Sequence, residues 1–217
     1  MEVLYKYRFE IFFATLLGIL FGTVIFAYQL FELLFQPLLF LLNLAAGILL
    51  ISKKKKLMWF FVFLFAVSAF IYGGQFFKAL DHPEFFILRL CIYFIFNIVV
   101  TVEIVRQVWQ ASFVNKNVIY GLMSGYISLG LLAYFCFRAI EFLHPGSFHG
   151  LTGPESDINS LLYFSYVTLL TIGYGDILPL NPMSQMVVII TGLSGQFYMV
   201  IITAVVIEKY IRHSRQD

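Results

Sequence analysis

Long uncharged runs dominate the chain and are separated by short charged segments. A helix needs about 20 predominantly apolar residues to cross the hydrocarbon core of a bilayer. The uncharged runs that reach about this length lie at residues 11–31, 33–52, 57–77, 117–137 and 177–207. The pattern predicts a transmembrane helix in each of these runs.

A sixth predicted span is less regular than the others. Residues 85–108 are strongly apolar but contain Arg89 near one end, and Glu103 and Arg106 near the other. Charged side chains near the end of a span can reach the polar interface, so we interpret this segment as membrane-spanning. Glu103 lies one helical turn before Arg106, and we expect a local ion pair between them.

The uncharged run at residues 158–175 differs from the spans at its end. Gly173 and Gly175 interrupt the apolar pattern, and Asp176 follows directly. Such a stretch suits a re-entrant element, which enters the membrane and leaves on the same side, better than it suits a crossing. The sequence therefore predicts six spans and one re-entrant segment.

The composition supports a membrane protein and excludes several other classes. Hydrophobic residues make up 61% of the 217 residues and charged residues 12%, whereas a soluble domain is about half apolar and a quarter charged. The net charge of +2 is too small to indicate nucleic-acid binding. We expect no enzyme, because no constellation of nucleophile, base or metal ligands stands out.

The positive charges predict how the spans are oriented. Lys and Arg near span ends prefer the cytoplasm. They gather in four segments next to span ends that this rule places on one side, at Lys6, Arg8, Lys53 to Lys56, Arg106, Lys116, Lys209, Arg212 and Arg215. We therefore expect a multi-pass protein of the cell membrane with both termini in the cytoplasm. Anionic lipid can be attracted by Lys53, Lys54, Lys55 and Lys56, although the orientation alone also accounts for these lysines.

The most specific signal in the chain is one hexapeptide, Thr171-Ile172-Gly173-Tyr174-Gly175-Asp176. It resembles the selectivity-filter signature of potassium channels. A bare Gly-x-Gly would carry little weight. This match covers six residues, follows a helix-length stretch and lies between two spans on the side assigned to the exterior.

Backbone chemistry explains why these residue types suit such a filter. A dehydrated potassium ion needs several oxygens in place of its water shell, and successive carbonyls point one way only if alternate residues adopt unusual dihedrals. Gly173 and Gly175 permit positive φ at little cost. The resemblance assigns the K⁺-coordinating oxygens to Thr171, Ile172, Gly173, Tyr174 and Gly175. Asp176 then places a negative charge at the outer mouth, and no cofactor is expected besides K⁺ as the permeant ion.

One filter strand cannot surround an ion, and the chain contains no second Gly-Tyr-Gly. The resemblance therefore implies a homotetramer with fourfold symmetry, in which three identical subunits complete the pore. The full predicted fold class is an all-α membrane protein with six transmembrane helices, a re-entrant pore helix and a selectivity filter, assembled as a tetramer.

Two regions are expected along the chain. Residues 1–116 form a four-span peripheral domain, which is placed like a voltage sensor but lacks the repeated Arg or Lys of one. Residues 117–217 form the pore domain, with an outer helix at 117–141, a pore helix at 159–170, the filter at 171–176 and an inner helix at 183–211.

The resemblance also assigns roles on the inner helix. It places a hinge at Gly195, for which close helix packing through small residues is the alternative. Helical spacing from Gly195 puts Gln196, Met199, Thr203 and Ile207 on one face, and the resemblance implies that this face lines the cavity. A ring of isoleucines can close a path by dewetting, so Ile207 and Ile211 are the candidates for a gate.

Alternatives stay open around the outer mouth. Arg138 and Glu141 are one turn apart, and they either tie the outer mouth or pair with each other. Val167 stands where some relatives of this pattern have an acidic residue, and it cannot pair with Asp176. How the filter is held from behind is therefore not predicted.

The predicted function is passive, potassium-selective conduction without steep voltage gating, because Arg89 and Arg106 are the only positive charges between Leu88 and Trp109. Three alternatives are a nonselective cation channel, a K⁺ transporter and a silent subunit that modulates another channel. Tyr174 and Asp176 complete the potassium pattern and disfavour a nonselective pore. Transporters of this architecture carry four weak filter repeats in one chain, whereas here there is one strong repeat.

Overall fold

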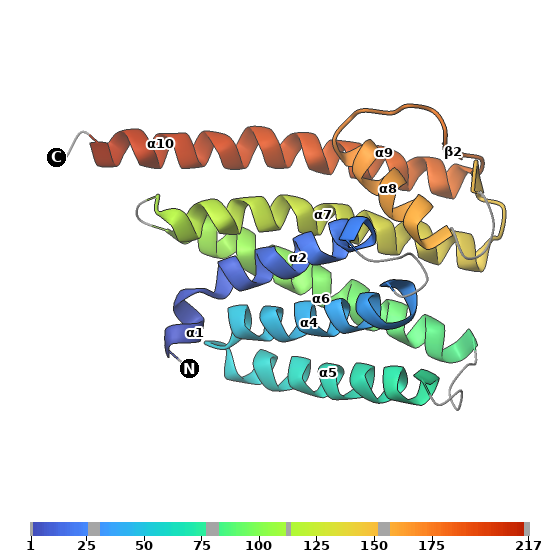
Figure 1. Ribbon diagram of the computed structural model, residues 1–217. Helices are drawn as coiled ribbons and strands as arrows, with labels where there is room; N and C mark the ends of the chain where they lie inside the picture. Colours follow the sequence, from blue (N-terminus) through green and yellow to red (C-terminus); the bar gives the residue numbers. More distant parts are fainter. Residues whose placement is uncertain (1, 26–30, 77–82, 112–113, 152–156, 215–217) are drawn as a thin grey trace. The chain divides into compact units, whose positions relative to one another are not determined.

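The computed structural model describes residues 2–25, 31–76, 83–111, 114–151 and 157–214 (Figure 1). The chain divides into two compact units, Met1–Ser124 and Gly125–Asp217. Helix α7 (Lys116–Leu143) begins in the first unit and continues in the second.

The first unit is helical throughout its described residues. Its further elements are α1 (Glu2–Lys6), α2 (Arg8–Ile25), the π-helix η1 (Phe31–Phe35), α4 (Gln36–Ile51), α5 (Lys55–Phe76) and α6 (Pro83–Gln110). Pro37 lies in the first turn of α4, directly after η1. A proline has no N–H to donate within a helix, so a change of hydrogen-bond register next to it has a physical cause.

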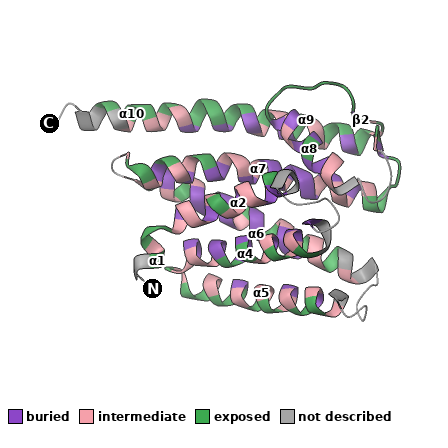
Figure 2. Ribbon diagram, viewed as in Figure 1, coloured by how far each residue is buried: buried purple, intermediate pink, exposed green. Residues whose placement is uncertain are grey.

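Close packing of aromatic rings on a glycine holds α4 against α6. A Cβ atom on Gly47 would lie 2.3 Å from Cζ of Phe96 and 3.0 Å from Cγ2 of Val100. The Phe96 ring meets Phe61 of α5 edge-on, with 5.6 Å between the ring centroids. Both rings are fully buried. Figure 2 shows buried positions along α4, coloured purple. The absence of a side chain at Gly47 therefore determines how closely the two helices approach.

The outward face of α5 is apolar and uncovered within its own unit. Its side chains Trp59, Phe63 and Phe70 are 67%, 63% and 72% exposed. Large apolar surfaces of this kind need an apolar surrounding or a partner. The face fits contact with lipid tails.

An ion pair forms at one end of the first unit, but not the one expected. Glu103 pairs with Lys54 and also accepts a hydrogen bond from Gln107 at 3.2 Å. The expected pair of Glu103 with Arg106 is wrong, because the Glu103 carboxylate lies toward the loop between α4 and α5 while Arg106 is exposed.

In the second unit, one short helix contacts two long ones. After α7 come β1 (Phe148–His149), α8 (Asp157–Leu169), β2 (Leu178–Pro179), α9 (Pro182–Phe197), the π-helix η2 (Tyr198–Ile202) and α10 (Thr203–Ser214). The two strands pair antiparallel, with Phe148 opposite Pro179 and His149 opposite Leu178.

Four helices in the described part of the chain are long and apolar enough to cross a membrane. They are Lys55–Gly74, Ile87–Gln110, Lys116–Leu143 and Pro182–Lys209, and Gln36–Ile51 is a shorter apolar helix. The prediction of an all-α membrane fold is confirmed at this level. Helix α8 has 13 residues, which at 1.5 Å per residue span about 20 Å and fall short of the hydrocarbon core of about 30 Å.

The last long helix begins later than the uncharged run at residues 177–207. Strand β2 and the cap Asn181 occupy the start of that run. Oδ1 of Asn181 accepts a hydrogen bond from the Ser184 backbone amide at 2.8 Å, and the backbone amide of Asn181 donates to Oγ of Ser184. This capping box satisfies free amides at the start of α9.

The compact units divide inside α7, whereas the sequence places a functional division between residues 116 and 117. The first turns of α7 pack in the first unit, since a Cβ atom on Gly121 would lie 3.0 Å from Val108 and 3.1 Å from Phe9. The functional division at residue 116 stays a prediction.

The packing of Gly47 can be tested against a matched glycine. Gly47→Ala is expected to lower the free energy of unfolding by about 1–3 kcal/mol, because the added methyl group overlaps a buried ring. Gly73→Ala is the control, since nothing lies within 4 Å of its Cβ position. Equilibrium unfolding of both variants in detergent measures the difference. Equal stability of the two variants would contradict this account of the packing.

Candidate functional site

The hexapeptide 171–176 follows α8 as an extended loop with an alternating backbone (Figure 1). Thr171, Gly173 and Gly175 have φ of +57°, +59° and +80°, whereas Ile172 and Tyr174 between them do not have positive φ. Gly173 and Gly175 thus adopt the conformation that the sequence argument required of them. Thr171 was not foreseen, and a positive φ at a β-branched residue costs about 1–3 kcal/mol.

Hydrogen bonds hold the amides of the loop against the end of α8. The carbonyl of Val167 accepts from the Ile172 amide at 2.9 Å and from the Gly173 amide at 3.4 Å. In a planar trans peptide the N–H and the preceding C=O point in opposite directions. The carbonyls of Thr171 and Ile172 are therefore directed away from α8, on the side where the loop is exposed.

Contacts from α7 position α8. The Tyr166 hydroxyl donates to the Ile127 carbonyl at 2.7 Å, and its ring lies on Gly130, where a Cβ atom would come within 2.3 Å of it. The Tyr126 hydroxyl donates to the Leu169 carbonyl at 3.3 Å. These bonds fix α8 along its length and at the end from which the loop departs.

Gly195 of the inner helix lies close to the end of α8, where the loop begins. A Cβ atom there would lie 2.6 Å from the Leu169 carbonyl oxygen. The residue is buried, and the π-helix η2 follows three residues later. The structure thus shows a close approach at Gly195, and its role as a hinge stays a prediction.

The other predicted residues of the inner helix lie before, within and after η2. Gln196, Met199, Ile207 and Ile211 are exposed in the single chain, and Thr203 is half-buried. A π-turn closes i→i+5 hydrogen bonds and so changes the helical register. Spacing of 3.6 residues therefore cannot be carried through η2, and the common cavity face of these residues stays a prediction, as does the gate at Ile207 and Ile211.

The loop that follows α7 is held to Glu141 and lies close to the end of the hexapeptide at Asp176. We call the contacts of Glu141 and Gly150 described here the clasp. The Glu141 carboxylate accepts hydrogen bonds from the amides of Gly146 at 2.7 Å and Phe148 at 3.2 Å. Gly150, with φ of +92°, lies so close to the Asp176 carbonyl oxygen that a Cβ atom would be 2.1 Å from it. The Glu141 carboxylate thus holds the loop at residues 146–148, and the place of this loop at an outer mouth stays a prediction.

Two further sets of contacts strengthen the clasp. The Leu180 amide donates to the Ser147 carbonyl at 2.8 Å, and Nδ2 of Asn181 donates to Oγ of Ser147 at 2.6 Å. Beneath the strand, the rings of Phe148, Phe137 and Phe164 form a buried cluster with centroid distances of 5.2 to 5.7 Å. The outer loop, α7 and α8 therefore share one core.

Sequence reasoning missed Tyr163 as a partner of Asp176. A hydrogen bond with the Asp176 carboxylate is the largest cause that raises the pKa of the Tyr163 phenol. Tyr163 lies four residues before Val167 and therefore on the same face of α8. This spacing was the available signal in the sequence, because Tyr163 lies one helical turn before Val167, which cannot itself pair with Asp176.

Comparisons with known proteins agree with this geometry. Residues 122–212, which contain most of α7, α8, the hexapeptide and most of the inner helix, match a protein family described as "Ion channel". A stretch of 59 residues, 27% of this chain, is 42% identical to two pore potassium channel c of Oryza sativa subsp. japonica. The stretch covers 13% of that protein's length. No solved structure matches the chain.

These comparisons and the apolar helices support a transmembrane ion channel related to potassium channels. The matched region coincides closely with the second compact unit. The first unit lies outside it except for its last three residues.

The clasp predicts a graded effect at Glu141. Glu141→Ala removes the acceptor of two amides and is expected to lower the free energy of unfolding by about 2 kcal/mol, as is typical of hydrogen bonds to a charged group. Glu141→Gln keeps one acceptor oxygen and should lose less. Equilibrium unfolding of the two variants in detergent tests the order, and stability equal to the unmodified protein in both would contradict the clasp.

Proposed function

We propose that the protein is a potassium-selective channel that conducts K⁺ passively through a homotetrameric pore. The alternating backbone of residues 171–175, with its amides bound to α8, is the observation that carries the proposal. Carbonyl oxygens turned to one side can replace the water shell of a K⁺ ion. The coordinating oxygens are those of Thr171, Ile172, Gly173, Tyr174 and Gly175.

Exposure of the filter in the single chain supports the tetramer. Tyr174 is 72% exposed and Ile172 47% exposed, and in the proposed filter these side chains would point away from the ion path. Neighbouring copies would cover these rings and methyl groups and would supply the missing oxygens around the ion. Asp176 then adds one negative charge per subunit at the outer mouth.

The proposed six-span arrangement adds two crossings to the helices that are long and apolar enough to cross a membrane by themselves. Helix α2 provides one crossing, and the continuous helical segment of η1 and α4, Phe31 to Ile51, provides another of about 30 Å. Together with α5, α6, α7 and the inner helix they make six proposed crossings, an even number that puts both termini on one side, and we propose that this side is the cytoplasm. Arg8, Lys53 and Arg106 line one pocket at one end of the first unit, which supports a common side for these predicted cytoplasmic segments.

Steep voltage sensing is not part of the proposal. Moving one charge through the membrane field yields about 2.3 kcal/mol per 100 mV, and α6 offers few charges to move. Arg89 stacks on the Tyr72 ring at 5.0 Å, and Arg106 lies at the opposite end of α6. The first unit therefore acts as a peripheral domain, and bending at Gly195 with closure at Ile207 and Ile211 forms the proposed gate.

Flux measurements on purified protein in liposomes test the proposal. The unmodified protein is expected to pass K⁺ and exclude Na⁺. Gly173→Ala is expected to reduce K⁺ flux at least about tenfold, since alanine in a left-handed conformation costs about 1–2 kcal/mol in each of four subunits. Nothing lies within 4 Å of the Gly173 Cβ position, so the effect comes from the backbone and not from a clash.

Gly192→Ala is the matched control. Its Cβ position is also open, and its φ is not positive. It should retain selective flux. Selective flux that survives Gly173→Ala, or that is lost equally in both variants, would overturn the assignment of the filter.

A further inference from the structure

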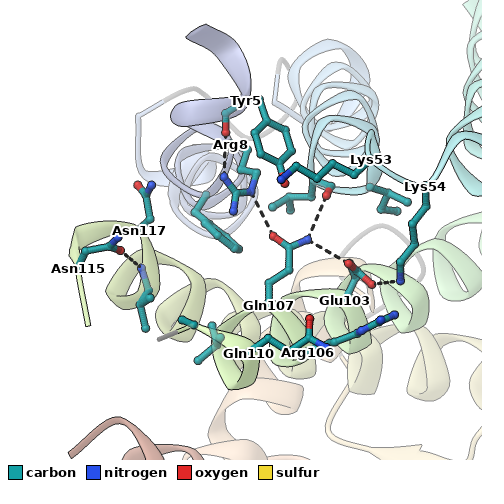
Figure 3. A pocket seen from close by; sticks show the side chains of 16 residues that line it. Tyr5, Arg8, Lys53, Lys54, Glu103, Arg106, Gln107, Gln110, Asn115 and Asn117 are labelled. Carbon is teal, nitrogen blue, oxygen red and sulfur yellow. Dashed lines mark hydrogen bonds and ion pairs between the residues drawn. The ribbon is translucent and has the colours of Figure 1, made fainter. Parts of the chain in front are cut away.

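One end of the first unit contains a pocket that the proposed pore does not use (Figure 3). Its volume is about 410 Å³, within the usual range for small-molecule sites of about 300–1,000 Å³. Its walls come from α1, the start of α2, the end of α4, the loop before α5, the end of α6 and the start of α7. Segments far apart in the sequence thus converge on one cavity.

Positive charge dominates the walls of this pocket. Arg8, Lys53, Lys54 and Arg106 line it together with a single carboxylate, Glu103. That carboxylate is engaged by Lys54. Within the described part of the chain, Arg8, Lys53 and Arg106 have no ion pair with a carboxylate. The pocket thus brings together three cations that form no ion pair among the described residues.

The Arg8 guanidinium is held in a fixed orientation at the pocket. It lies 4.2 Å from the Tyr5 ring centroid and 4.6 Å from that of Phe9. Nε donates to Oε1 of Gln107 at 3.1 Å, and Nη1 donates to the Tyr5 carbonyl at 3.0 Å. A guanidinium has five N–H donors, so these two hydrogen bonds leave donors for a ligand.

Gln107 is fixed in turn by its own hydrogen bonds. Its Nε2 donates to the Leu50 carbonyl at 3.1 Å and to Oε1 of Glu103 at 3.2 Å (Figure 3). The amide therefore presents its oxygen to Arg8 and its nitrogen to the α4 end and Glu103. The Arg8 donors are therefore in place before any ligand arrives, which lowers the entropy cost of binding.

The chemistry of these donors favours phosphate. A guanidinium matches the oxygens of a phosphate through paired hydrogen bonds, and a lysine adds a compact charge. The preference of positive charge for the cytoplasm explains why such residues lie on one side. It does not explain why Lys53 and Arg106, which come from different segments, line one cavity that Lys55 and Lys56 do not line.

We infer that this pocket binds a phosphate group, carried by an anionic lipid headgroup or by a soluble phosphate compound, through Arg8, Lys53 and Arg106. The sequence predicts that Lys53 to Lys56 can attract anionic lipid. The proposed site restricts this contact to one cavity, which Lys53 and Lys54 line and Lys55 and Lys56 do not. It rests on the proposed cytoplasmic orientation but not on conduction. Lipid binding and ion flux can therefore fail independently of each other.

The test uses the full chain in phosphatidylcholine nanodiscs, titrated with fluorescent phosphatidic acid. Lys53→Gln combined with Arg106→Gln removes two charges from the pocket. Lys55→Gln combined with Lys56→Gln removes two charges from the same end outside the pocket. The pocket variant is expected to bind phosphatidic acid about thirtyfold more weakly, and the control less than about fivefold more weakly. Arg8 is left unchanged because its hydrogen bonds also join two helices.

Inorganic phosphate distinguishes the two sources of the ligand. Competition by millimolar phosphate that is lost in the pocket variant indicates a soluble phosphate compound, and selective lipid binding without competition indicates a headgroup. Either result supports the site. Two results would overturn the inference. An equal loss of affinity for phosphatidic acid in the two double variants would show that only the general surface charge matters. Absence of binding by either probe would exclude a phosphate site.

Discussion

The pair of hydrogen bonds from the Ile172 and Gly173 amides to the Val167 carbonyl is the interaction on which the site depends. These bonds turn two successive amides toward α8, and peptide planarity then turns the preceding carbonyls the other way. Positive φ at alternate residues extends the same direction along the loop. A row of oxygens can face one path only while α8 stays where it is.

The second unit fixes α8 at several points. Tyr166 and Gly130 set its distance from α7, and Leu169 meets both Tyr126 and Gly195 at the start of the loop. The Glu141 clasp holds the outer end. None of these side chains has to touch an ion. Their contribution is positional, because coordination by backbone oxygens tolerates little displacement of the peptides that carry them.

Some of this organisation could be predicted from the sequence, and the rest depended on tertiary contacts. Run length located the long helices, because bilayer thickness fixes how many apolar residues a crossing needs. The hexapeptide predicted two left-handed positions correctly, because positive φ at Gly173 and Gly175 is a local property of glycine. The positive φ of Thr171 and the register change at η2 are not visible in residue types. Glu103 had two cations within reach, and only the fold brings Lys54 to it.

The two units therefore rest on different principles: ring-on-glycine packing with one charged end in the first, and a backbone held in an uncommon conformation in the second. The central claim concerns the second. Diffraction from crystals grown with Rb⁺, measured at the rubidium absorption edge, tests it most directly. The account predicts a row of anomalous peaks on a fourfold axis, within coordination distance of the carbonyl oxygens of residues 171–175. Peaks bound only by side-chain carboxylates, or an axis without peaks, would contradict it.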